Sequence, residues 1–404
     1  MRFASSDALF ERARAVIPGG IAGIRAPGNF VEGQYPKFLS GGQGGRVRDP
    51  DGNTYVDLLL GYGPIILGHA EPRVDQAAAA RAAEGFCLNL PQPPMVELAE
   101  TLTRLVPSAE QCLFFKTGSD ATTAAVRLAR AHTGRPKILR CGYHGWHDWC
   151  VEDDPGVPAS QRGEVLAFPY NDAAALAALL DAHREQVAAI MLTPLGHDFD
   201  AQIELPQPGF LASVRGLAER HGVLLVFDEV RTGFRIDLGG AQARFGVTPD
   251  LTALGKAMAN GYPITALVGG RDVMESSAKT FISSTYFPNG MEMAAALATL
   301  TALTERDVLG EIRAAGARLR EGMQAVLTET GLPATLSPLE ELPFLHFDTS
   351  ADPSHGALRD RFYGALAGHG VFAHPRHHGF LCARHNDADL DQVVEALRDV
   401  ARSL

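Results

Sequence analysis

Lys256 closes a short apolar segment, residues 250–255, and small residues follow it as far as Gly261. A lysine at the end of a buried strand is partly desolvated, which favours the neutral amine that reacts with carbonyl groups. The more common fate of a lysine is to pack its aliphatic stem and keep its charge in water. Taken alone, Lys256 is either a reactive amine or, more often for this residue type, a surface cation.

Two acids, Asp228 and Glu229, follow an apolar run over residues 223–227. Open α/β sheets bind their ligands at the carboxyl ends of the strands, where these acids are expected. A carboxylate there can bind a metal ion, a ribose or a pyridinium nitrogen. The alternative is a solvated strand end without a ligand.

Gly118, Ser119 and Asp120 stand between a predicted strand, residues 112–115, and a predicted helix, residues 121–132. Glycine lets a ligand approach the backbone, and the free N–H groups of a helix start favour a phosphate. The alternative is that Ser119 or Asp120 only caps the helix. The segment is not a Walker loop and lacks the GxGxxG pattern of dinucleotide sites.

The three segments together match the requirements of pyridoxal 5'-phosphate (PLP). Lys256 would form a Schiff base with the cofactor aldehyde, and Asp228 would pair with the pyridinium nitrogen. The cofactor phosphate would lie on the segment that begins at Gly118. The combination favours the ligand-binding role of each segment over the structural alternative given for it.

Strands and helices must alternate to bring these segments together. Apolar runs of strand length alternate with helical spacing through the middle of the chain, which favours a largely parallel sheet with crossover helices. We therefore predict an α/β fold with a large domain over residues 56–300. Residues 1–55 and 301–404 are expected to form a smaller α+β domain, to which the first of these segments contributes.

Composition excludes several classes of function. The net charge of the 404 residues is -11, and no basic run is present that would favour nucleic acid. The five cysteines are scattered without a CxxC pair, which argues against a zinc site or a disulfide framework and fits a reducing cytoplasm. No apolar segment is long enough to span a membrane.

The chain resembles the class III (ω) aminotransferases of PLP fold type I, and within them the glutamate-1-semialdehyde 2,1-aminomutases. The resemblance runs from about Val16 to the final helix. It rests on seven matching segments: Val16–Gly20 with Arg25, Gly63–His69, Thr117–Ala121, Tyr143–Gly145, Asp228–Arg235, Leu254–Lys256, and Thr285 with Asn289.

The resemblance implies a role for each matching residue. Lys256 takes the Schiff-base position and Asp228 the position beside the pyridine nitrogen, while Tyr143 stacks on the cofactor ring and His144 also contacts the cofactor. Thr285 matches a threonine that reaches the phosphate of the neighbouring subunit, which implies a homodimer with shared active sites. The cofactor would alternate between PLP and pyridoxamine 5'-phosphate while a small amine and a small carbonyl compound react.

Three departures from the family bear on the reaction. Thr193-Pro194 replaces a Glu-Pro pair, and Asn289-Gly290 replaces Asn-Pro. His377 stands where the aminomutases carry a glutamate. The aminotransferase is therefore the leading hypothesis, an aminomutase or epimerase is the alternative, and a non-catalytic PLP-fold binding protein is a remote one.

Five further residues are candidates for substrate binding. Arginine binds carboxylates through a planar pair of hydrogen bonds, although Arg231 has the alternative of an ion pair with Glu229. The histidines at 374, 377 and 378 lack a nearby acidic or cysteine ligand, so we predict that they form a pocket wall or serve a structural role, and we predict no metal site. The candidates are Arg25, Trp146, Arg231, Arg376 and His377.

Overall fold

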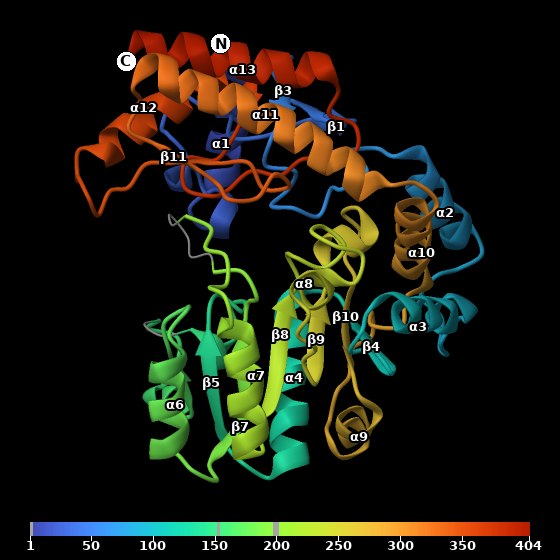
Figure 1. Cartoon of the computed structure of the whole chain (residues 1–404). Helices are drawn as coiled ribbons and strands as arrows, with labels where there is room; N and C mark the ends of the chain where they lie inside the picture. The colour runs from blue at the N-terminus through green and yellow to red at the C-terminus, as the bar shows by residue number, and fades with distance from the viewer. Residues whose placement is uncertain (1–2, 152–153, 197–201) are drawn as a thin grey trace. The chain divides into compact units, whose positions relative to one another are not determined.

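The computed structural model describes residues 3–151, 154–196 and 202–404. Contacts between residues divide the chain into two compact units (Figure 1). The first unit comprises residues 1–71, 199–203 and 307–404, and the second comprises residues 72–198 and 204–306. The main unit boundaries fall after residues 71 and 306, whereas the predicted domain limits were 55 and 300.

The second unit is built on a seven-stranded sheet with the order β4-β10-β9-β8-β7-β5-β6. Strand β10 is antiparallel to both neighbours, and the other adjacent pairs are parallel. This confirms the predicted α/β fold with a mainly parallel sheet. The strands are β4 (Gln111–Phe115), β5 (Lys137–Cys141), β6 (Val165–Ala167), β7 (Val187–Leu192), β8 (Leu224–Glu229), β9 (Leu251–Leu254) and β10 (Thr265–Gly269).

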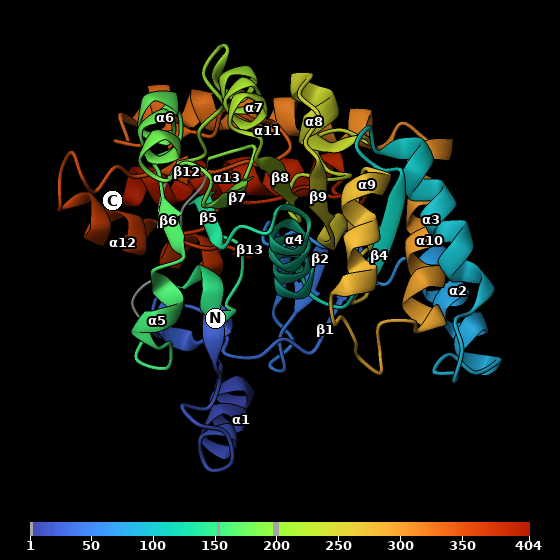
Figure 2. The ribbon, with the colours of Figure 1, turned by 90° about the horizontal axis from the view of Figure 1, so that it is seen from below.

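Both faces of this sheet are buried, which explains the unbroken apolar runs of its strands. Val226 packs in the same core cluster as the buried face of α4 (Gly118–Thr133). Its neighbours Leu225 and Phe227 pack instead with α6 (Ala173–Ala182) and α7 (Phe210–His221). Figure 2 shows α4 on one side of the sheet and α6 and α7 on the other. The alternation of side chains along a strand produces this division.

Three further long helices of the second unit pack against one another. Helix α10 (Gly290–Glu305) packs against α2 (Pro72–Ala83) and α3 (Pro93–Leu105). Short helices complete the unit: η3 (Asp148–Cys150), α5 (Ala159–Arg162), α8 (Gly240–Phe245), η4 (Lys256–Ala259), α9 (Arg271–Met274) and η5 (Glu275–Lys279).

The first unit contains a small mixed sheet and three long helices. Its sheet has the order β1-β2-β3-β13, with β13 parallel to β3 and the other pairs antiparallel. Helix α11 packs along α13, and α12 contacts both α13 and β13. The elements are α1 (Ala4–Arg14), η1 (Gly23–Arg25), η2 (Pro27–Asn29), β1 (Gly41–Gln43), β2 (Arg46–Arg48), β3 (Thr54–Asp57), α11 (Val308–Thr330), β11 (Thr335–Leu336), β12 (Leu345–His346), α12 (His355–Gly368), β13 (Val371–Phe372) and α13 (Asp387–Ser403).

No helix within the described ranges is long and apolar enough to cross a membrane. The longest, α11, carries charged residues throughout its length. The structure therefore offers no membrane-spanning helix in the part of the chain that it describes.

Candidate active site

The carboxyl edge of the parallel strands gathers the predicted cofactor residues of the second unit. Strand β8 ends with Asp228 and Glu229, and Lys256 follows β9 after one glycine. Tyr143 and His144 follow β5 in the same way. Because parallel strands end at one edge of a sheet, residues far apart in the sequence become neighbours there.

Val230 shows how closely these segments approach one another. A Cβ atom added to Gly118, at the start of α4, would lie 3.1 Å from Val230 Cγ1. A Cβ atom added to Gly255, the residue before Lys256, would lie 3.4 Å from the same atom. The start of α4, the residue before Lys256 and the segment that follows β8 therefore meet around one side chain.

Asp228 is held by a buried histidine. Its Oδ2 atom lies 3.0 Å from His144 Nδ1, and its Oδ1 atom accepts a hydrogen bond from the backbone N–H of Val230. Asp228 is 8% exposed and His144 is 2% exposed. A charged carboxylate in such a setting needs partners of this kind, and one oxygen keeps room for a further donor.

Two further contacts restrain His144, one at its backbone and one at its ring. Thr122 Oγ1 donates a hydrogen bond to the carbonyl oxygen of His144, and the Trp149 ring stacks on the imidazole at 6.1 Å. The Trp149 indole N–H in turn donates to Thr123 Oγ1. These contacts hold the imidazole, so that its Nδ1 stays directed at Asp228.

The start of α4 forms a turn that suits an anion. Thr117 and Asp120 close a reciprocal capping box, in which the Asp120 carboxylate accepts from the Thr117 N–H. The Ser119 hydroxyl accepts a hydrogen bond from the N–H of Trp146 at 3.3 Å and keeps its own proton for another acceptor. The capping role proposed as an alternative for Asp120 is thus present, and its cofactor contact stays a prediction.

The donor set at this edge fits PLP. The helix start offers backbone N–H groups and the Ser119 hydroxyl to a phosphate, and Asp228 offers a carboxylate to a ring nitrogen. The Tyr143 side chain is 59% exposed, so its ring is available to cover a flat ligand. Two buried polar atoms, His144 Nε2 and Thr193 Oγ1, have no hydrogen-bond partner among the described residues. Unmatched polar atoms of this kind are typical of a ligand site.

Thr193 was noted in the sequence only as a departure from a family pattern. It follows β7 and is 4% exposed, at the same edge as Asp228. A Cβ atom added to Gly142 would lie 2.3 Å from its hydroxyl oxygen, so the segment after β5 packs directly on it. The available signal was the end of an apolar run at a hydroxyl residue before Pro194.

Lys256 has an unusual backbone. Its φ angle is 43°, in the left-handed region that residues with a Cβ atom adopt infrequently. Such conformations cluster at functional sites, where the surrounding structure enforces them. The side chain is half-buried, between the buried residues Gly255 and Ala257.

Arg231 is a half-buried cation with no ion pair to Glu229 in the described part of the chain. The Glu229 carboxylate instead accepts from Thr232 Oγ1 and from the backbone N–H groups of Ala241 and Gln242. Burial lowers the pKa of Arg231 to about 10, against the opposing effects of Asp228 and Tyr143, so it stays charged at neutral pH. Its Nε atom is buried without a hydrogen-bond partner among the described residues.

Thr285 and Trp146 lie in exposed parts of the second unit. Trp146 is 73% exposed, and Thr285 is also exposed. Phe281 and Tyr286, beside Thr285, are 83% and 60% exposed.

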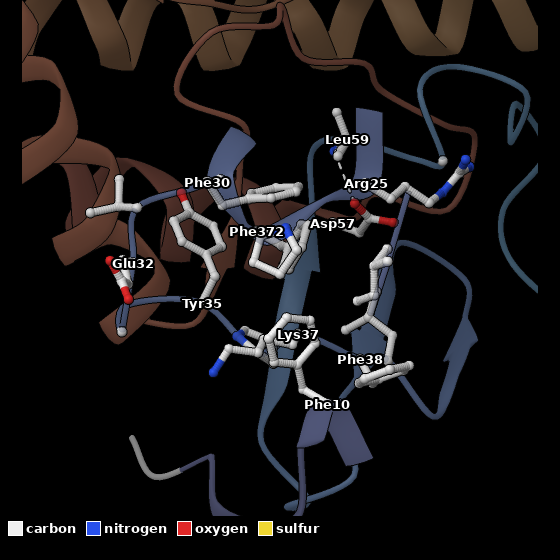
Figure 3. A pocket seen from close by; sticks show the side chains of 18 of the residues that line it. Phe10, Arg25, Phe30, Glu32, Tyr35, Lys37, Phe38, Asp57, Leu59 and Phe372 are labelled. Atoms are coloured by element: carbon white, nitrogen blue, oxygen red, sulfur yellow. Dashed lines mark hydrogen bonds between the residues drawn. The ribbon is translucent and has the colours of Figure 1, made fainter. Parts of the chain in front are cut away.

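The other predicted substrate residues belong to the first unit. Arg25 lies over the ring of Tyr62, 5.4 Å from its centre, at the edge of a cavity (Figure 3). Arg376 faces Asp360 at 3.9 Å, and His377 packs edge-on against Tyr62. Their contact with a substrate stays a prediction.

The histidines of this unit are packed among aromatic rings. His374 accepts a hydrogen bond at Nδ1 from the Arg376 N–H and packs against Phe30. Burial, followed by the nearby Arg376 and Arg359, lowers the pKa of His374 to about 3. Among the described residues, no group of three or more His, Cys, Asp or Glu side chains is arranged to hold a metal ion.

Sequence comparison assigns the family. The family profile described as aminotransferase class-III matches residues 30–334. The 3-aminobutyryl-CoA aminotransferase of Cloacimonas acidaminovorans is 46% identical over 401 residues, with 99% of this chain and 97% of that protein covered. The glutamate-1-semialdehyde 2,1-aminomutase of Desulfitobacterium hafniense is 37% identical over 428 residues, with 99% and 98% covered.

Structural comparison agrees with the sequence. The FumI protein of Sphingopyxis sp. MTA144, solved in its PLP internal aldimine form, matches with a TM-score of 0.95 and 34% identity. The match covers 99% of this chain and 96% of that one. This similarity confirms the predicted PLP fold type I and the predicted cofactor.

Proposed function

Because this chain belongs to the class III aminotransferases and is a PLP-dependent enzyme, we propose that Lys256 holds the cofactor as a Schiff base and that Asp228 binds its ring nitrogen. The observation that carries the proposal is the meeting of Gly118, Gly255 and the end of β8 around Val230.

Bound PLP supplies an electron sink for the pair of electrons left when a proton leaves the carbon that bears the amine. Lys256 is the proposed general base that accepts that proton. The left-handed backbone at Lys256 supports this role, because it sets the direction in which the side chain leaves the strand end. Lys256 thus both holds the cofactor and moves the proton.

Asp228 keeps a proton on the ring nitrogen, and His144 is proposed as its positioning residue. A charge-assisted hydrogen bond between the carboxylate and the ring nitrogen is strongest where water is excluded. The 3.0 Å contact with His144 fixes the orientation of the carboxylate without neutralising it. This contact would direct the carboxylate of Asp228 toward the ring nitrogen.

Ser119 and the first N–H groups of α4 would bind the phosphate. We further propose a homodimer in which Thr285 serves the phosphate of the neighbouring subunit. The exposed rings of Phe281 and Tyr286 support this interface, since a second copy would cover them. Free cysteines at all five positions support a cytoplasmic enzyme.

The proposed donor is an amine on the carbon β to a carboxyl group or its thioester, by analogy with the 3-aminobutyryl-CoA aminotransferase. Arg231 supports an acidic substrate, because it is a half-buried cation whose buried Nε has no hydrogen-bond partner among the described residues, and an anionic ligand would supply one. We propose that Arg231 binds the carboxyl group or the thioester carbonyl.

The test is a panel of amines added to the purified enzyme, with the cofactor absorbance followed in the presence and absence of a 2-oxo acid. An aminotransferase converts the cofactor to the pyridoxamine form with the amine alone and turns over only when the acceptor is added. Turnover of a single substrate without an acceptor would contradict transamination and favour an aminomutase or epimerase.

A further inference from the structure

A buried ion pair in the second unit joins the residue before the proposed phosphate site to helix α10. Lys116 lies between β4 and Thr117, and Glu292 lies in the first turn of α10 (Figure 1). The Lys116 Nζ atom is 3.1 Å from Glu292 Oε1, and the two side chains are only 15% and 7% exposed. The pair therefore connects two segments that are far apart in the sequence.

The surroundings of this pair are not those of an ion pair that stabilises a fold. Removal of two charges from water is costly, and their attraction offsets that cost only when the remaining lone pairs are also matched. The Oε2 atom of Glu292 is buried and has no hydrogen-bond partner among the described residues. Burial lowers the pKa of Lys116, against the opposing effects of Glu292 and Cys87. An apolar pair of similar size would stabilise the fold at least as well, so the two charges need a different explanation.

The phosphate turn, residues 117–119, has two other supports. Thr265 Oγ1 donates a hydrogen bond to the carbonyl oxygen of Thr117 at 2.9 Å, which ties the turn to β10. Thr117 and Asp120 close the capping box at the start of α4, which orders the turn internally. Neither of these contacts ties the turn to α10, and the contact between Lys116 and Glu292 supplies that link.

The segment that precedes α10 packs on the same strand end. The ring of Phe287 meets the ring of Phe115 edge-on, with 5.0 Å between their centres. Phe115 is the last residue of β4 and is 1% exposed. Phe287 lies two residues after Thr285, which is proposed to serve the phosphate of the neighbouring subunit. Phe115 and Lys116 thus hold the segment from Thr285 into α10 through one apolar and one charged contact.

We propose that Lys116 and Glu292 are positioning residues for the cofactor phosphate, because the pair fixes the phosphate turn against the start of α10. Hydrogen bonds weaken steeply when donor and acceptor are misaligned, so a fixed turn keeps the Ser119 hydroxyl and the first N–H groups of α4 directed at a phosphate. This inference rests on the proposed function, which places the phosphate at Ser119. Each subunit of a homodimer would contain both linked segments, so loss of the pair would weaken the hold on the phosphate by either route.

The test compares two aldehydes, PLP and pyridoxal, which carries a hydroxyl group where PLP carries the phosphate. The full-length enzyme is freed of cofactor and titrated with each aldehyde, and the absorbance of the Schiff base reports binding. The parent should bind PLP about a hundredfold more tightly, because pyridoxal cannot form the charge-assisted hydrogen bonds of a phosphate. Equal affinity of the parent for the two aldehydes would overturn the proposed phosphate site itself, and this inference with it.

The double variant Lys116→Met with Glu292→Leu removes both charges and nearly keeps the volume of the side chains. Its midpoint of unfolding in denaturant should stay close to that of the parent, because an apolar pair replaces the buried ion pair. Its affinity for PLP should fall about tenfold, while its affinity for pyridoxal stays unchanged. Parallel losses of both affinities would assign the pair to the fold alone, and unchanged affinities would show that the turn needs no such support. Either result would overturn the proposal with the phosphate site intact.

The matched control is another ion pair of the same unit, Lys137 with Glu164, whose charged atoms lie 3.3 Å apart. Lys137 begins β5, at the end of the strand opposite the cofactor edge, so Lys137→Met with Glu164→Leu should leave both affinities unchanged. A loss of phosphate preference in this control equal to that in the Lys116 variant would also overturn the proposal.

Glu292→Gln serves as a second variant if the double substitution prevents folding. It keeps the shape of the side chain but removes the charge that holds Lys116. The affinity for PLP should again fall severalfold to about tenfold, with no change for pyridoxal. A ratio of the two affinities equal to that of the parent would contradict the positioning role.

Discussion

The cofactor edge of the second unit and the aromatic cavity of the first unit are two candidate ligand sites of different construction. At the cofactor edge, Asp228 and His144 are almost fully buried and bonded to each other. In the cavity, aromatic rings form the walls, and Arg25, which has no ion pair with a described residue, is exposed. Groups that move protons need a fixed, water-poor setting, whereas a group that selects substrates needs access. We therefore assign the proton transfer to the cofactor edge and the selection of substrate to the cavity.

Of all the substitutions, that of Lys256 should have the largest effect on turnover. Lys256→Ala removes both the covalent hold on the cofactor and the general base, so turnover should fall by about a thousandfold or more. The measurement is the steady-state rate with the best amine of the panel. Lys279→Ala, an exposed lysine of the same unit, is the control and should keep the parent rate. Wild-type turnover in Lys256→Ala would refute the assignment.

Substitution of Asp228 should have the second-largest effect, on the rate of proton removal. Asp228→Asn keeps the shape and the contact with His144 but loses the charge, and the rate of proton removal should fall about 100- to 1,000-fold. Single-turnover absorbance measures that step. The exposed carboxylate of Asp272, changed in Asp272→Asn, is the control. A near-normal single-turnover rate in Asp228→Asn would contradict its role at the ring nitrogen.

Arg231 tests whether the cofactor edge also selects substrate. Arg231→Gln should raise KM for an acidic amine about 10- to 100-fold, the usual range for a lost charge-assisted hydrogen bond, with little change in kcat. The neutral amide of the same amine is the comparison and should be affected far less. Equal changes for acid and amide would assign Arg231 to the scaffold and leave selection to the first unit.

His374 should have the smallest effect, on stability in acid. Its pKa is about 3 in the folded chain and 6.5 in the unfolded chain, so between these values the unfolded chain binds more protons. Stability contributed by neutral His374 is therefore lost as pH falls below about 6.5. His374→Asn keeps an acceptor for the Arg376 N–H but does not titrate. Between pH 7 and 5.5, the free energy of unfolding should therefore fall by about 1 kcal/mol less in this variant than in the parent.

Denaturant unfolding at the two pH values measures this difference. The comparison of each protein with itself removes the cost of the substitution at pH 7. An equal loss of stability in the two proteins would show that His374 does not carry the pH dependence of the first unit.

The cofactor edge was largely predictable from the sequence because its signals are local. The buried strands β7 and β8 are unbroken apolar runs, and parallel strands must end at one edge, so Asp228 and Lys256 could be placed together. The contact between His144 and Asp228 was not predictable, since it depends on the turn after β5 and on the packing of Trp149.

The aromatic cavity and the antiparallel direction of β10 could not be predicted from the sequence. Tyr35 and Phe372 face each other at 5.6 Å although more than 300 residues separate them, and no local pattern indicates such a contact. Strand β10 lies between β9 and β4, and its direction follows from tertiary pairing rather than from its own residues. Long-range packing of this kind is decided by the whole fold.

Chemical trapping tests the central claim, that Lys256 holds the cofactor, most directly. Borohydride reduction of the PLP-loaded enzyme fixes the cofactor to the amine that holds it, and peptide mapping by mass spectrometry then identifies that lysine. The phosphopyridoxyl group should be found on the peptide that contains Lys256. Its presence on Lys116 or Lys279 instead, with Lys256 unmodified, would contradict the account.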